Sequence, residues 1–134
     1  MIVSTGLFAG VMLRVNRLIN ARRQAEQELI ESEQNYRTLA DTGQTMIWTA
    51  GTDKRCNYFN KAWLDFTGRT LAQEMYDGWT EGVHPDDFDF CLKTYVEAFD
   101  RRVQFEMNYR LRHHSGEYRW IQDEGAPRYD AQGQ

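Results

Sequence analysis

Cysteine, histidine and proline are scarce in this chain of 134 residues, and their scarcity excludes several kinds of functional site. The two cysteines, Cys56 and Cys91, are far apart, so they form neither a disulfide framework nor a paired-cysteine metal or redox motif. No phosphate-binding loop, nucleophile elbow or kinase signature occurs in the sequence, which predicts no catalytic residue. The cysteine usage fits a reducing compartment such as the cytosol.

Positive charge is also limited. The chain has 16 lysines and arginines against 20 aspartates and glutamates, which gives a net charge of −4. A chain with this balance is not built to bind nucleic acid. With 41% hydrophobic and 27% charged residues the composition is ordinary for a globular protein, and the length suffices for one domain with a core.

Residues 1–13 carry no charge at all, and four arginines follow by position 23. The segment is too short to span a bilayer, which needs about 20 residues, and it lacks the basic start and cleavage site of a secretory signal. One interpretation is the inner end of a transmembrane helix, which would place the rest of the chain at the cytoplasmic face of the membrane. The alternative is an apolar helix buried in an oligomer, or a disordered end.

Residues 11–41 contain neither glycine nor proline, which predicts a long helix. Apolar residues fill most positions of a seam with alternating steps of four and three residues, whereas polar residues fill the other face. This heptad seam consists of Val11, Val15, Leu18, Arg22, Ala25, Leu29, Ser32, Tyr36 and Leu39. We interpret residues 14–41 as a coiled-coil-like linker through which two copies pair in parallel. The alternative is a single helix that packs on the domain behind it.

Residues 42–134 contain two hairpin patterns that flank three helical patterns. The predicted strands are residues 45–50, 56–59, 103–112 and 117–128, and the predicted helices are residues 60–68, 70–75 and 85–101. Residues 76–82 predict a loop. This order predicts an α+β domain with one antiparallel sheet and the helices on one of its faces. The turn signal in the last residues predicts a further strand beyond Gln134.

The stretch VHPDDFDF, residues 83–90, combines His84 with three aspartates. A metal site needs three or four converging ligands, whereas a helix would spread these side chains around its axis. Pro85 suits the first helical position, and Asp86 and Asp87 suit the first turn of a helix. We therefore predict that this stretch begins a helix and binds no metal.

Five stretches together resemble a PAS sensor domain with its PAC-type C-terminal half. They are SEQNYRTLADTG, YFNKAWLDFTGRT, WTEGVHPDD, FEMNYRLRHHSGEYRWI and GAPRYDAQGQ, and they cover about residues 32–134. The resemblance implies a PAS fold, in which a five-stranded antiparallel sheet cups the helices. The family's fifth strand is central and is often followed by an Asp-x-Thr coupling motif; both would lie beyond Gln134. The chain thus looks like an N-terminal fragment of a bacterial sensor protein.

The resemblance also bears on ligands. Flavin-binding light sensors of the family carry a cysteine before the long helix, and haem-binding members carry a histidine within it. Residues 70–79 have no cysteine and residues 85–101 have no histidine, so both modes are disfavoured and the cofactor is unknown. The candidate pocket residues are Trp48, Phe59, Trp63, Phe66, Met75, Leu92, Tyr95, Phe105, Met107 and Tyr109. The alternative is that they only fill the core. Asn57 or Asn60 can orient a ligand, although Asn60 suits a helix cap equally well.

The function implied by the resemblance is a sensory module that relays a ligand or partner state through the N-terminal helix to an output domain. That domain would be a histidine kinase in a phosphorelay, so this chain itself would be no enzyme. The chain is expected to form a homodimer through its N-terminal helix. The alternative function is a ligand-free interaction or dimerisation module of a diguanylate cyclase or another regulator.

Overall fold

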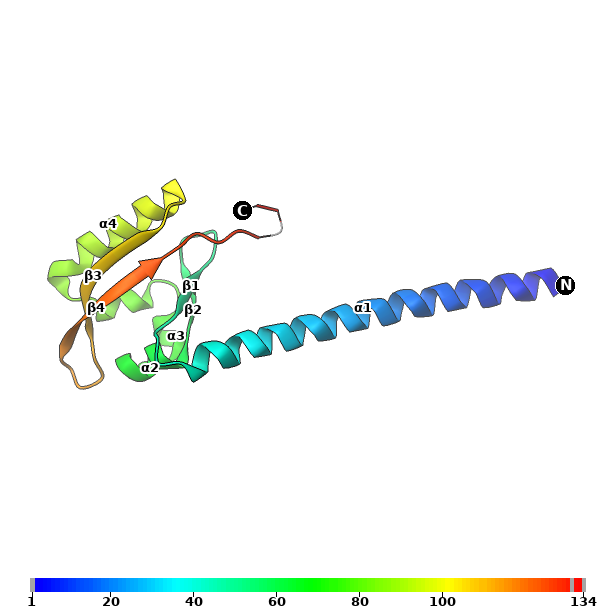
Figure 1. Cartoon of the computed structure of the whole chain (residues 1–134), viewed down its shortest axis with the longest axis horizontal. Coiled ribbons are helices and arrows are strands. Elements are labelled where there is room, and N and C mark those ends of the chain that lie inside the picture. Colours follow the sequence, from blue (N-terminus) through cyan, green and yellow to red (C-terminus); the bar gives the residue numbers. More distant parts are fainter. Residues whose placement is uncertain (1, 131, 134) are drawn as a thin grey trace. The chain divides into compact units, whose positions relative to one another are not determined.

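The structure is a computed structural model that describes residues 2–130, 132 and 133, with side chains described from residue 10 onward in that range. It divides into two compact units, residues 1–39 and residues 40–134, and each is described by itself. In chain order the elements are α1 (Ile2–Thr42), β1 (Trp48–Ala50), β2 (Cys56–Phe59), α2 (Lys61–Thr67), α3 (Leu71–Glu74), η1 (Gly78–Gly82), α4 (Pro85–Arg101), β3 (Phe105–Arg112) and β4 (Tyr118–Gly125) (Figure 1).

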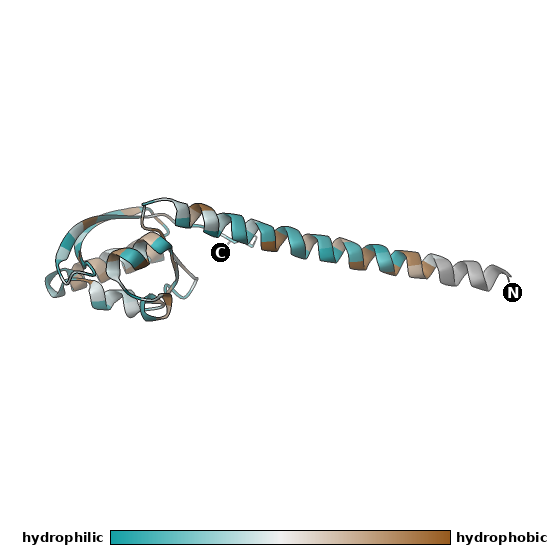
Figure 2. Ribbon diagram, turned by 90° about the horizontal axis from the view of Figure 1, so that it is seen from below, coloured by the Kyte–Doolittle hydropathy of each residue, from teal (hydrophilic) through white to brown (hydrophobic). Residues whose placement is uncertain are grey.

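Helix α1 confirms the predicted long N-terminal helix. Side-chain bonds one turn apart support its polar face, including a contact of 3.2 Å between Arg22 Nε and Glu26 Oε1. Hydrophobic and hydrophilic residues intersperse along its described part (Figure 2). Within the described residues, no helix is both long and apolar enough to cross a membrane. The apolar segment predicted at residues 1–13 lies mostly outside the described side chains.

The first hairpin is shorter than predicted, because β1 begins at Trp48 and not at residue 45. The side chain of Asn60 occupies the backbone groups that precede β1: its Nδ2 donates to Thr45 O at 2.8 Å, and its Oδ1 accepts from Ile47 N at 2.8 Å. These groups are therefore not available to a strand ladder. Asn60 also caps α2 by accepting from Trp63 N, and Gly68 ends that helix with a φ of 68°.

The segment between α2 and α4 is more regular than predicted. Thr70 and Gln73 form the predicted capping box at the start of α3. Residues predicted as a loop instead form the 3-10 helix η1. The turn into η1 requires glycine, since a Cβ atom at Gly78 would lie 1.8 Å from Gln73 O.

Helix α4 begins and ends where the sequence predicts. His84 occupies the N-cap position, where its ring accepts from Asp86 N, and Pro85 is the first helical residue. Cys91, Tyr95 and Ala98 are its buried residues, whereas Leu92 is exposed.

The second hairpin pairs β3 with β4 in antiparallel register, from Phe105 opposite Gly125 to Arg112 opposite Tyr118. Alternate residues of β3 point into the core, as predicted, so that Met107, Tyr109 and Leu111 are buried. Both strands are shorter than predicted. At the end of β4, a Cβ atom at position 125 would overlap the Phe105 ring, with an approach of 2.0 Å, so the ring covers the backbone there.

The α+β class is confirmed, and α4 packs against β3 (Figure 1). The predicted single sheet is not what the described strands form, because β1–β2 and β3–β4 are two separate two-stranded sheets. The hairpins are joined by a hydrogen bond of 2.9 Å from Trp48 Nε1 to Asp123 Oδ1 instead of by a strand ladder. A ladder needs adjacent backbones, and no backbone pairing joins the described strands of the two hairpins.

Candidate ligand cavity

An aromatic cavity lies inside the unit formed by residues 40–134. Its free space has room for about one water molecule. Both hairpins, α2, η1 and α4 contribute to its wall. The lining residues are Trp48, Cys56, Phe59, Trp63, Trp79, Tyr95, Met107, Tyr109 and Asp123.

The aromatic rings of the wall contact one another. Phe59 and Trp63 have ring centroids 4.9 Å apart, and Tyr95 meets Trp48 edge-on at 5.7 Å. Tyr95 also meets Trp79 edge-on at 6.5 Å. Such offset and edge-on contacts are favourable for aromatic pairs, so these rings support one another in the wall of the cavity.

Asp123 brings a carboxylate into this wall and is 9% exposed. Trp48 Nε1 donates to its Oδ1 and Tyr109 Oη donates to its Oδ2, each at 2.9 Å. Burial raises the pKa of Asp123 above its usual value, whereas the two hydrogen bonds oppose this shift by stabilising the charged form. Both donors are neutral groups, so neither compensates the negative charge.

The two thiols are poorly reactive. Cys56 lines the cavity and Cys91 lies in the adjoining core, and both are buried. Burial raises the pKa of each thiol to about 12, so the nucleophilic thiolate is a negligible fraction at neutral pH.

Asn60 lies beside the cavity as a junction and not as part of its wall. It is 0% exposed, and its Nδ2 donates to Ala40 O at 2.7 Å as well as to Thr45 O. A second bond ties the end of α1 to α2, since Lys61 N donates to Asp41 Oδ1 at 2.8 Å. The last turn of α1, the entry to β1 and the start of α2 are thus held together by one buried amide. Asn57, the other candidate amide, is exposed and accepts from Thr49 Oγ1.

The stretch around His84 forms a helix start and an ion pair. Asp87 Oδ2 accepts from Arg110 Nε at 2.8 Å and Oδ1 accepts from Arg110 Nη2 at 2.9 Å, which ties α4 to β3. The hydrogen bonds from Arg110 lower the pKa of Asp87 to about 2. Across the described residues, no group of three or more metal-ligating side chains converges.

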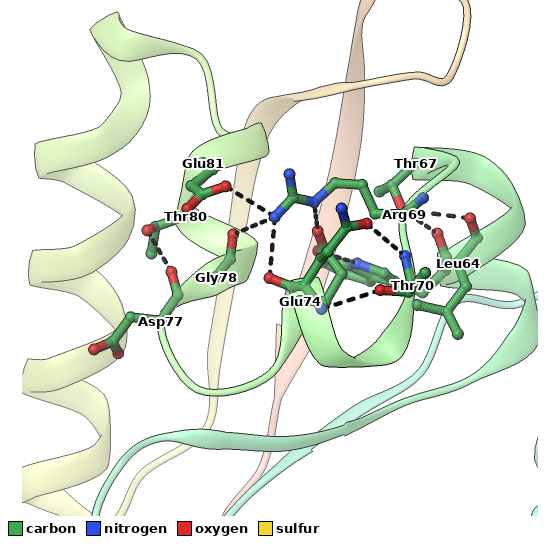
Figure 3. Close-up of polar contacts among 11 residues, drawn as sticks. Leu64, Thr67, Arg69, Thr70, Glu74, Asp77, Gly78, Thr80 and Glu81 are labelled. Atoms are coloured by element: carbon green, nitrogen blue, oxygen red, sulfur yellow. Dashed lines mark hydrogen bonds and ion pairs between the residues drawn. The ribbon is translucent and has the colours of Figure 1, made fainter.

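A second buried carboxylate, Glu74, lies in a closed ion-pair cluster (Figure 3). Glu74 is 1% exposed; Trp63 Nε1 donates to its Oε2 at 2.8 Å, and Arg69 Nε donates to its Oε1. Arg69 also donates to Glu81 Oε2 at 2.9 Å, which joins η1 to the cluster. Both carboxylate oxygens of Glu74 are occupied and its charge is paired, so this cluster supports the wall of the cavity without offering a free group.

Six of the ten residues predicted for the pocket line the cavity, namely Trp48, Phe59, Trp63, Tyr95, Met107 and Tyr109. Phe105 lines a neighbouring open groove, Phe66 packs edge-on against His113, and Met75 ends α3. Leu92, which is 39% exposed, is not among the residues that line the cavity. Sequence reasoning missed Cys56, Trp79 and Asp123. The alternation of β4 could have found Asp123, which lies on the same strand face as Ile121.

An α+β unit whose hairpins and helices enclose an aromatic cavity has the architecture of a small sensor domain. A family model described as PAS fold matches residues 57–134, and the chain belongs to this family. The N-terminal domain of a diguanylate cyclase with a PAS/PAC sensor from Marinobacter aquaeolei has the same fold, with a TM-score of 0.57 and 23% identity. That match covers 64% of this chain and 81% of the solved one.

Curated relatives support a role in signalling. The uncharacterized protein y4lL of Sinorhizobium fredii is 37% identical over 115 residues, which cover 86% of this chain and 14% of that protein. The peroxide stress-activated histidine kinase mak1 of Schizosaccharomyces pombe is 25% identical over 123 residues, covering 84% of this chain and 8% of the kinase. The chain therefore spans only a small part of these relatives. It is a PAS sensor domain of signal transduction.

Proposed function

We propose that this chain senses the state of its aromatic cavity and passes that state through α1 to an output domain with histidine kinase activity. The observation that supports this is the junction at Asn60. Trp48 lines the cavity, and the residue before it, Ile47, binds Asn60 through both its backbone N–H and its backbone carbonyl. Asn60 in turn binds the carbonyl of Ala40 in the last turn of α1.

A movement of Trp48 therefore reaches the end of α1 through two sets of buried hydrogen bonds. Buried bonds of this kind are costly to leave unmade, so the attached segments move together instead of separating. A ligand can shift the equilibrium only if it binds one arrangement of Trp48 more tightly than the other. The chain itself supplies no catalytic step in this proposal and acts as the controlling element of a longer protein.

The second part of the proposal is that α1 pairs with the α1 of another copy. Large apolar side chains of the heptad seam are exposed along the helix: Val11 by 51%, Leu18 by 71%, Leu29 by 60% and Tyr36 by 52%. A row of this kind buries its apolar surface when two helices coil around each other. The pairing would convert a change at the cavity into a change in the relative position of two output domains.

Light scattering tests the pairing. Residues 1–134 are expected to have the mass of a dimer, whereas residues 32–134, which keep the Asn60 junction, are expected to be monomeric. A monomer in both cases at high micromolar concentration would contradict the pairing.

The kinase output is supported by the two fission-yeast relatives, mak1 and mak3, which are named as histidine kinases. The test is incubation of the full-length protein with labelled ATP, followed by acid and base treatment. Label that is lost in acid and retained in base, as expected for phosphohistidine, supports the proposal. Synthesis of a cyclic dinucleotide from GTP without such label would instead assign a diguanylate cyclase output.

A further inference from the structure

Among the described residues, Asp123 is the single carboxylate in the wall of the cavity, and no lysine, arginine or histidine lines it. The other titratable groups that face the cavity are Cys56, Tyr95 and Tyr109, and burial raises the pKa of each of them, so they are neutral at physiological pH. Within the described part of the chain, Asp123 makes no ion pair. The ionised carboxylate is therefore a lone negative charge in an aromatic wall.

This arrangement is unusual energetically. A buried charge without a counter-ion is costly, and the neutral N–H and O–H donors of Trp48 and Tyr109 offset only part of that cost. The faces of tryptophan, tyrosine and phenylalanine rings attract cations because of their quadrupole. A cation in the cavity would thus meet the Asp123 carboxylate and the aromatic rings of the wall.

We infer that the cavity binds a small alkylammonium ion, with one ammonium N–H donating to Asp123 and the alkyl group held among the aromatic rings. This inference deepens the proposed function, because it names the class of ligand that would set the state of the sensor. The effect of the ligand on α1 rests on the proposed function, whereas binding itself can be measured without any output domain.

The proposal includes a route by which such an ion enters. Trp48 and Tyr95 line both the inner cavity and a neighbouring open groove, so these two rings lie between the two spaces. The free space is too small for an alkylammonium ion while Trp48 stays in place. When Trp48 turns outward it releases Asp123 Oδ1, and the incoming ammonium group takes that acceptor. Binding and displacement of Trp48 are therefore one exchange of hydrogen-bond donors.

Calorimetry and tryptophan fluorescence of residues 1–134 test the inference with ethylammonium chloride as the probe. Sodium chloride at equal ionic strength and ethanol, a neutral molecule of similar size, are the controls. Ethylammonium is expected to bind saturably, at least about tenfold more tightly than ethanol, because only the cation gains from the carboxylate and the ring faces. Equal binding of ethanol, or no saturable binding of ethylammonium, would overturn the inference.

Two variants locate the site. Asp123→Asn keeps the shape but removes the charge, and it is expected to lose at least about tenfold in affinity. Glu106→Gln is the matched control, since Glu106 lies on β3, is exposed, and lines neither the cavity nor the groove; the affinity of this variant should equal that of the unchanged chain. Retention of full affinity by Asp123→Asn would refute the inference.

Trp48→Phe keeps an aromatic ring but has no indole N–H, so the ammonium group no longer competes for Asp123 Oδ1. This variant is expected to bind ethylammonium more tightly than the unchanged chain. It serves as the test of the inference if circular dichroism shows that Asp123→Asn does not fold. Weaker binding would refute the exchange.

The kinase activity of the full-length protein distinguishes the ligand site from the proposed relay. If ethylammonium binds as expected but leaves the kinase activity unchanged, the proposed relay fails and the ligand site stands. Absence of binding in a protein that still autophosphorylates would leave the relay intact and remove the ligand site.

Discussion

Two buried carboxylates of this PAS domain, Glu74 and Asp123, show how different surroundings give one chemical group different roles. Glu74 is 1% exposed and paired with Arg69, so its charge is compensated and the cluster is closed. Asp123 is 9% exposed and receives only neutral donors beside an open space. The comparison shows that Arg69 compensates the charge of Glu74, whereas among the described residues Asp123 accepts hydrogen bonds from neutral groups alone.

The largest effect is expected from breaking the closed cluster. Arg69→Met leaves Glu74 buried without a counter-ion, which should lower the free energy of unfolding by about 3–5 kcal/mol. Urea denaturation followed by fluorescence measures the loss. Lys61→Met is the matched control, because it removes an exposed pair, with Lys61 Nζ 2.6 Å from Asp65 Oδ2, and should cost about 0.5 kcal/mol or less. Similar losses in both variants would show that the cluster is no more important than a surface pair.

A smaller effect is expected at Asp87, a half-buried carboxylate with a guanidinium partner. Asp87→Asn removes the charge-assisted bonds to Arg110 and should cost about 1–3 kcal/mol at neutral pH. Asp86→Asn is the control, since the Asp86 side chain is 78% exposed and its Oδ2 lies 4.0 Å from Arg110 Nη2; it should change stability by about 0.5 kcal/mol at most.

The pH dependence at Asp87 has a definite sign. Its pKa in the folded chain, about 2, lies below its ordinary value of 3.8, so its contribution is present above the ordinary value and lost as the pH falls through the lower one. The stability difference between the unchanged chain and Asp87→Asn should therefore shrink on acidification. A difference that stays constant down to the acid transition would contradict this assignment.

The contribution of Asp123 to stability should change with pH in the opposite direction to that of Asp87, and by a smaller amount. Burial raises its pKa above 3.8, so its contribution to stability is present below that value and lost as the pH rises through the raised pKa. The unchanged chain should therefore gain stability relative to Asp123→Asn as the pH is lowered from neutrality toward 4. Parallel denaturation series for the two chains measure this. A slope of the same sign as that of Asp87 would mean that Asp123 has a compensating cation, and the comparison with Glu74 would disappear.

The smallest expected difference concerns the two thiols. Cys56 lines the cavity that Trp48 and Tyr95 close, whereas Cys91 lies in the adjoining core. In native protein both should react very slowly with methyl methanethiosulfonate, because burial raises both pKa values to about 12. Comparison of Cys56→Ser with Cys91→Ser should show that the thiol of Cys56 reacts several times faster. Equal rates would indicate that the cavity opens no more often than the core.

Local signals allowed much of the fold to be predicted. The bounds of α4, the cap at Asn60 and the capping box at Thr70 depend on residues within one turn of the helix, so a short window of sequence contains their cause. The alternation of buried and exposed residues along β3 also depends on neighbouring positions in the sequence. The burial of Ala98 and the exposure of Leu92 on α4 were less predictable, since they depend on tertiary packing.

The candidate site was only partly predictable because its members come together over long distances in the chain. Large aromatic residues signal a core, which is why six cavity residues could be named before the structure. Asp123 looks like an ordinary polar strand residue until its partners are known, and Trp48 is 75 positions away from it. Trp79 lies in a segment whose sequence indicates a loop, yet η1 places it in the wall.

The sequence alone determined the order of helices and hairpins, the helix caps and the membership of the PAS family, because these depend on near neighbours and on residue order. Only the tertiary structure decided that Arg69 compensates Glu74 and that nothing in the wall compensates Asp123. The reason is physical: the energy of a buried charge depends on what lies within a few ångströms in space, and most of those neighbours are distant along the chain.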